Sequence, residues 1–204
     1  MGEPTSETDR GRHDWPTVLA IGLVVYVLAK LVHEALGHGL ACEIMGSELK
    51  GFSSSWCDCD KDPLKEGATR VVKGAGPIAH RLARAGVLVV VVRRSFRTGA
   101  ALYFVWLCAA VNLLMGGGYL MVDPLFLFGD WGQFVDGLDP NLPLRLALTG
   151  VGVAISLGTF FLLRAPFQRL LGGTEGARKR RARSLCWTPY FLVGGLAMTG
   201  AALL

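Results

Sequence analysis

The sequence predicts an all-α polytopic membrane protein with about five transmembrane helices and a short β-prone link between the first two. Of its 204 residues, 51% are hydrophobic and only 18% are charged, and the mean hydropathy is +0.42. The apolar residues fall in long blocks, and about 18 consecutive apolar residues are enough to cross the hydrocarbon core of a bilayer. We therefore expect one membrane domain over residues 15–204, preceded by a polar, disordered tail over residues 1–14.

Four apolar blocks are clear, and a fifth is weaker because His80, Arg81 and Arg84 interrupt its first half. The first block is not a cleavable signal peptide, because it lacks a small-residue cleavage site and continues directly into the sequence HEALGH. Pro16 suits the first turn of a helix, and no proline follows it before residue 45. The expected spans cover about residues 16–45, 74–92, 99–121, 144–163 and 185–204.

The charges of the links predict the orientation in the lipid bilayer. Three arginines follow the second span, and seven basic residues crowd the link after the fourth, whereas the link over 122–143 carries four aspartates and no lysine or arginine. The positive-inside rule then places the N-terminus in the cytoplasm and the acidic link on the other side. The basic run over 178–183 lies between two spans, so we expect it to face lipid headgroups and not nucleic acid.

The stretch KLVHEALGHGLA over residues 30–41 places His33, Glu34 and His38 at the end of the first span. Ionisable groups within a span are costly unless they serve a site. Neutral imidazoles are the commonest zinc ligands, and a glutamate beside the metal can take a proton from a bound water. Histidines five residues apart diverge by about 140° on an α-helix, so chelation requires a π-bulge, which Gly37 would ease. The alternative is that both histidines are polar residues at the membrane interface.

The segment VHEALGHGLA resembles the metal-binding helix of the site-2 protease family of intramembrane zinc metallopeptidases, which carries H-E-x-G-H. The stretch GAGPIAH, residues 74–80, is similar to the A-G-P-x-x-N element of that family, which opens the next helix; His80 stands in place of the asparagine. Asn112, followed by Gly129-Asp130-Trp131, is similar to the third-span asparagine and the later aspartate that completes the zinc site, although the usual L-D-G setting is absent.

The resemblance implies a Zn²⁺ ion held by His33, His38 and Asp130, with Glu34 as the catalytic base. Asp123 is the reserve ligand, and its alternative is a solvated turn residue. The resemblance also places Asn112, His80 and Pro77, the last in the first turn of its helix, in substrate binding or support of the site. For His80 a substrate-positioning donor, a further metal contact and a cavity-facing polar residue all stay open. The resemblance also implies a small hairpin or membrane-associated strands within residues 46–73, a polar and β-prone stretch.

The implied function is hydrolysis of peptide bonds in or next to the membrane segments of substrate proteins, with the active site toward the non-cytoplasmic face. One alternative is a catalytically inactive relative that binds membrane helices as a regulator. Another is a small metal or ion transporter, which would need polar groups across the full depth of the bilayer. Cys42 is expected to be able to form a disulfide with Cys57 or Cys59 in an oxidising compartment.

Overall fold

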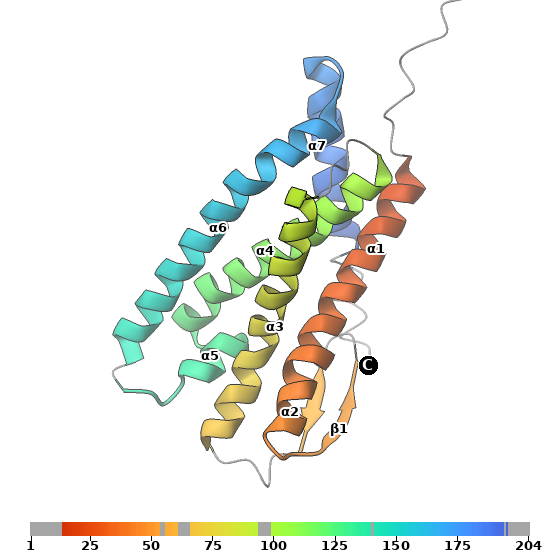
Figure 1. Cartoon of the computed structure of the whole chain (residues 1–204). Helices are drawn as coiled ribbons and strands as arrows, with labels where there is room; N and C mark the ends of the chain where they lie inside the picture. The colour runs from red at the N-terminus through yellow and green to blue at the C-terminus, as the bar shows by residue number, and fades with distance from the viewer. Residues whose placement is uncertain are drawn as a thin grey trace, which may run out of the picture.

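The computed structural model describes residues 14–53, 56–60, 66–93, 99–139, 141–193 and 195, and most of this part of the chain is helical (Figure 1). Residues 1–13 of the expected tail and half of the last expected span lie outside the described residues. The elements, in chain order, are α1 (Trp15–Leu31), the π-helix η2 (Val32–Gly39), α2 (Leu40–Ile44), β1 (Leu49–Phe52), β2 (Cys57–Cys59), α3 (Glu66–Arg93), α4 (Ala100–Phe126), α5 (Gly129–Val135), α6 (Asn141–Leu171), α7 (Glu175–Thr188) and the π-helix η3 (Pro189–Val193).

Within the described residues, three helical segments are long and apolar enough to cross a membrane: Trp15–Ile44, Ala100–Phe126 and Asn141–Leu171. They agree with the first, third and fourth expected spans, and they support a helical membrane protein. The second expected span lies within α3, and the fifth begins in α7 and η3. The total of about five spans therefore stays a prediction.

The first long segment is one continuous helix made of α1, η2 and α2. Its start is fixed by Asp14, whose carboxylate accepts a hydrogen bond from the backbone N–H of Thr17 at 3.2 Å. Such a side-chain cap satisfies one of the N–H groups that the first turn of a helix leaves free, and Pro16 needs no such partner.

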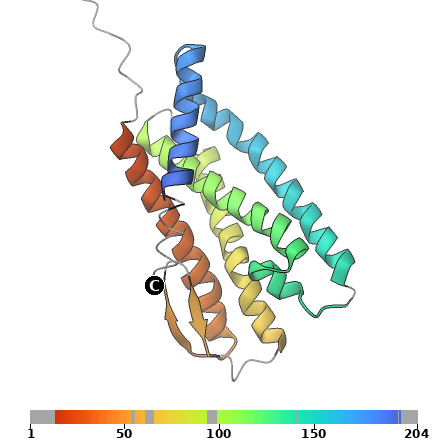
Figure 2. The ribbon, with the colours of Figure 1, turned by 180° about the vertical axis from the view of Figure 1, so that it is seen from behind.

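Helix α4 lies at the centre of the bundle and packs against α1, α3, α5 and α6. Figures 1 and 2 show it crossing the molecule obliquely, with α3 on one side and α7 on the other. Polar groups of its buried aromatic residues bind backbone carbonyls of other helices: the Tyr103 hydroxyl donates to Leu185 at 2.9 Å, and the Trp106 indole donates to Leu163 at 3.2 Å. Because lipid competes equally well for apolar side chains, such interhelical hydrogen bonds help to fix the packing.

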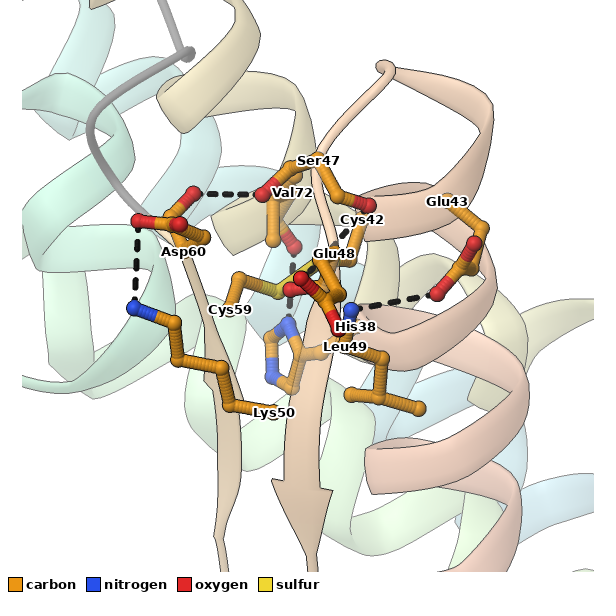
Figure 3. Close-up of a disulfide and its surroundings, with 10 residues drawn as sticks. All are labelled: His38, Cys42, Glu43, Ser47, Glu48, Leu49, Lys50, Cys59, Asp60 and Val72. Atoms are coloured by element: carbon orange, nitrogen blue, oxygen red, sulfur yellow. Dashed lines mark hydrogen bonds and ion pairs between the residues drawn. A yellow bond between two sulfur atoms is a disulfide. The ribbon is translucent and has the colours of Figure 1, made fainter.

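The expected hairpin is present as the antiparallel strands β1 and β2, which lie beside the end of α2 (Figure 1). A disulfide joins Cys42 on α2 to Cys59 on β2, one of the two pairings that the sequence allows (Figure 3). The Leu49 N–H also donates to the Glu43 carboxylate at 3.1 Å, and the Ser47 hydroxyl donates to the Asp60 carbonyl. The hairpin is thereby held against the helix that carries the two histidines.

Two local expectations were wrong, one for Pro77 and one for Asp123. Pro77 does not lie in a first turn, because α3 begins at Glu66 and Pro77 is inside it. The earlier turns are held by contacts distant in sequence: Arg70 donates to the Phe134 carbonyl at 3.1 Å, and Val72 is buried. Interior prolines are tolerated in membrane helices, where neighbouring groups compensate for the missing hydrogen bond.

Asp123 is not a solvated turn residue. Helix α4 continues to Phe126 with Pro124 inside it, and Asp123 is only 3% exposed. A buried carboxylate requires polar partners, and α5 supplies them, as described below.

Candidate metal centre

The two histidines lie on a π-helix of eight residues, Val32–Gly39, so the expected widening is confirmed and extends over the whole motif. A π-helix accommodates one more residue per turn than an α-helix, which brings positions i and i+5 to the same face. His33 and His38 are both buried, and their Nε2 atoms lie 3.3 Å apart. The spacing of five that would separate them on an α-helix therefore brings them together here.

The close approach of α3 explains why glycines surround this π-helix. A Cβ atom on Gly37 would overlap the backbone of Gly76, so η2 and α3 touch backbone to backbone at this point. A Cβ atom on Gly76 would overlap His38 Nε2 and lie 2.9 Å from His33 Cε1. Both imidazoles thus pack directly against Gly76.

Asp130 on the short helix α5 completes the group. Its Oδ2 atom lies 2.9 Å from His33 Nε2 and 3.3 Å from His38 Nε2. Ligand atoms around a tetrahedral zinc ion, with bonds of about 2.05 Å, lie about 3.3 Å apart. The three ligand atoms are therefore spaced much as three ligands of a tetrahedral zinc ion would be, and the three side chains could hold a metal ion.

A backbone carbonyl fixes the orientation of His38. His38 Nδ1 lies 2.7 Å from the Val72 carbonyl oxygen on α3 (Figure 3). A carbonyl only accepts hydrogen bonds, so Nδ1 carries a proton, and Nε2 is the ring nitrogen left to bind a metal; without a metal, a proton on Nε2 is donated toward Asp130. Metal-bound histidines generally have such a partner on their second nitrogen.

Asp130 is in the anionic form that metal binding requires. Burial acts to raise its pKa, but hydrogen bonds from His33 and His38, and their charge, outweigh burial and hold the pKa well below the usual range of an aspartate. Asp130 therefore stays a carboxylate down to acidic pH and does not need to lose a proton when a metal binds at neutral pH.

Asp123, the reserve ligand, is outside the group formed by His33, His38 and Asp130. Its carboxylate accepts a hydrogen bond from the backbone N–H of Trp131, and its own carbonyl accepts from Phe128 at 3.3 Å. Gly129 has a φ of +61°, and a Cβ atom there would lie 2.6 Å from Asp123 Oδ2. Asp123 thus holds the start of α5 in place and thereby orients Asp130.

Asn112 and His80 are hydrogen-bonded to each other close to His33. The Asn112 amide donates to the Cys108 carbonyl at 2.8 Å, which leaves its oxygen to accept from His80 Nδ1 at 2.8 Å. The His80 ring lies 4.9 Å from the His33 ring, and its side chain is fully buried. Neither residue lines the cavity described next, so their position favours support of His33 over contact with substrate.

A cavity of about 410 Å³ opens onto the group, within the range of about 300–1,000 Å³ typical of ligand sites. Glu34, only 5% exposed, lines it together with His33, His38 and Asp130. Among the other lining residues, Lys30 and Tyr119 were not singled out from the sequence. Lys30 had a detectable signal, because it is a cation within an apolar span, whereas a tyrosine is a common residue in such a span.

A substitution at Gly76 tests the packing of both imidazoles against α3. We expect Gly76→Ala to weaken zinc binding at least about tenfold, the lower end of the effect of losing a supporting contact, because the added methyl displaces both imidazoles. Gly67→Ala is a matched control on the same helix, since nothing lies within 4 Å of a Cβ atom there. Competition with a fluorescent zinc chelator measures both affinities. Equal affinity for Gly76→Ala and wild type would mean that the imidazoles are not held against α3.

Comparisons of the chain with protein-family models, with curated proteins and with solved structures find no match. The functional interpretation therefore depends on the geometry of this site and on the motifs that it unites.

Proposed function

We propose that this protein is an intramembrane zinc metallopeptidase that cleaves peptide bonds in or next to the membrane segments of other proteins. The observation that carries the proposal is the placement of Glu34 in the same buried cavity as the three converging donors of His33, His38 and Asp130. A triangle of two imidazoles and one carboxylate leaves one tetrahedral position open, as in catalytic zinc sites.

The residues divide the chemistry among them. Zinc, when bound, acts as a Lewis acid that lowers the pKa of a water ligand and polarises a carbonyl. Glu34 accepts the proton of the attacking water and delivers it to the departing amine. Val72 keeps His38 in the tautomer that binds metal, and the buried position of Glu34 strengthens its electrostatic interactions.

The position of the site supports a substrate that comes from the membrane. His33 and His38 belong to a helix long and apolar enough to span the bilayer. A cavity at this depth admits a peptide only in extended form, because a helix hides its scissile bonds within its own hydrogen-bonded turns. The hairpin and α5, which border the cavity, lie at one end of the bundle (Figure 1).

Two features favour a non-cytoplasmic location for this end. The exposed arginines of α6 and α7 lie at the opposite end, which the positive-inside rule assigns to the cytoplasm (Figure 2). The disulfide between Cys42 and Cys59 lies at the end that bears the site, and disulfides persist in oxidising compartments.

The geometry favours an enzyme over an inactive relative or a transporter. An inactive relative has no need to keep a carboxylate such as Glu34 buried beside the ligands, since an unpaired buried charge is costly. A transport path needs polar groups along the whole depth of the bundle. The described imidazole and carboxylate side chains of the cavity instead gather toward one end.

Metal removal tests the proposal. Purified protein reconstituted with a panel of single-span membrane proteins is expected to cleave at least one of them, to lose cleavage when a chelator removes zinc, and to recover it when zinc is added back. Mass spectrometry of the products measures cleavage and locates the bond. Cleavage that continues at full rate without metal, or zinc-loaded protein that cleaves nothing in the panel, would contradict the proposal.

A further inference from the structure

Lys30 is a charged residue at membrane depth that the proposed chemistry does not use. It lies at the middle of the helical segment Trp15–Ile44, about 20 Å from either end at 1.5 Å per residue. In a hydrocarbon core about 30 Å thick, this places it within the bilayer. A lysine at such a depth is costly to insert into a bilayer, so it is expected where a function requires it.

The side chain of Lys30 faces the cavity and is half-buried. It lies three residues before His33 and four before Glu34, on the helix that carries both. Its ammonium forms no ion pair within 4 Å with any acidic residue in the part of the chain that the structure describes. The water of the cavity is therefore its solvent when no substrate is bound.

The acidic residues of the cavity are Glu34, Asp58, Asp123 and Asp130, and none of them forms an ion pair with Lys30 within 4 Å. Asp130 instead interacts with His33 and His38, and Asp123 is engaged by the backbone of α5. Lys73, the other cation of the cavity, lies two turns from the start of α3, at the end of the bundle that carries the hairpin. Of these two cations, Lys30 is the one deeper in the membrane.

A bound substrate changes the solvation of the Lys30 ammonium. A peptide segment that fills the cavity displaces the water that solvates the ammonium, and burying an unpaired charge is costly. The cost disappears when the substrate supplies a negatively charged oxygen. A carboxylate near the scissile bond is one source, and the oxyanion that forms at the attacked carbonyl is the other.

We propose that Lys30 is the anion-binding residue of this cavity and pairs with a negatively charged oxygen of the bound substrate. The inference rests on the proposed peptidase function, which it deepens: it predicts either a preference for substrates with an acidic residue next to the cleaved bond or a role for Lys30 in stabilising the oxyanion.

Binding measurements test the inference without any need for turnover. We would use the zinc-loaded Glu34→Gln variant as the parent and add Lys30→Met, Lys30→Arg or, as control, Lys179→Met, which removes an exposed lysine of α7. Three membrane-soluble probes would be titrated by calorimetry: a peptide with Glu beside the scissile bond, the same peptide with Gln, and a phosphinic analogue that carries one negative charge in place of the scissile carbonyl. Zinc content is measured for each variant, so that a loss of metal is recognised.

The binding results distinguish a substrate carboxylate from the oxyanion as the partner of Lys30. If Lys30 binds a substrate carboxylate, the parent prefers the Glu peptide at least about tenfold, and Lys30→Met removes that preference. If Lys30 binds the oxyanion, the two peptides bind alike, and Lys30→Met weakens only the phosphinic probe, by about 10²–10³-fold. In either case Lys30→Arg retains part of the effect, and Lys179→Met retains all of it.

The inference is overturned if Lys30→Met binds all three probes within about twofold of the parent, or if the parent binds none of them. The cleavage assay of the wild-type protein decides the peptidase proposal separately. Cleavage by wild type together with unchanged binding by Lys30→Met would leave the function intact and exclude this role for Lys30.

Discussion

Glu34→Gln is expected to abolish peptide hydrolysis while the protein keeps its zinc. Glu34 is the carboxylate of the cavity that lies next to His33 in the chain, and it is not one of the three converging donors. The amide of glutamine has nearly the same shape but cannot accept the proton of the attacking water. Loss of a general base lowers kcat by about 10²–10⁴-fold. Cleavage of a reconstituted membrane substrate measures kcat, and atomic emission measures zinc per chain.

Glu48→Gln is the matched control, because Glu48 is an exposed glutamate before β1 and outside the cavity. It is expected to leave both cleavage and zinc content unchanged. If the Glu34→Gln variant cleaved the substrate at the wild-type rate, the assignment of Glu34 as the catalytic base would be wrong. Loss of zinc from this variant would instead show that Glu34 is a ligand.

The second large effect concerns the aspartates. Asp130→Asn is expected to weaken zinc binding by more than about 100-fold, because the amide loses the negative charge and is a poor zinc ligand. Asp123→Asn is expected to weaken zinc binding less, by about 10–100-fold, because Asp123 acts through the backbone of α5 that positions Asp130. Asp136→Asn, at the exposed end of α5, is expected to have no effect.

Zinc affinity of the purified variants, measured by competition with chelators of known affinity, gives this order directly. The reverse order, with Asp123→Asn more severe than Asp130→Asn, would make Asp123 the ligand. Equal and small effects of the three substitutions on zinc affinity would mean that none of these three aspartates contributes to the site.

Much of the site could be predicted from sequence because its key residues are local. His33, Glu34 and His38 lie within six residues of one helix. Because a π-helical turn absorbs an inserted residue, a spacing of five predicts a π-helix if the histidines are to meet, and the structure contains it. The long apolar helices were predictable for a similar reason, since composition alone sets the length that spans a bilayer.

The remaining features depend on contacts distant in sequence. The choice between Asp123 and Asp130 is made by the turn after α4, where the left-handed backbone of Leu127 and Gly129 redirects the chain toward η2. The early start of α3 reflects contacts of Arg70 with α5, and the full burial of His80 reflects its bond to Asn112 on α4. No local pattern encodes these pairings. A hairpin was one of the two arrangements that the resemblance implied for this β-prone stretch, but its attachment through Cys59 instead of Cys57 is decided by how it lies against α2.

X-ray absorption spectroscopy of the purified wild-type protein at the zinc edge tests the central claim most directly, namely that histidines five residues apart on a π-helix form a metal centre with Asp130. The account predicts about one zinc per chain, bound by two imidazole nitrogens and by oxygen at about 2.0–2.2 Å, with the imidazole signal lost in His38→Ala. Protein that binds no zinc after reconstitution, or zinc whose spectrum is the same in wild type and His38→Ala, would contradict it.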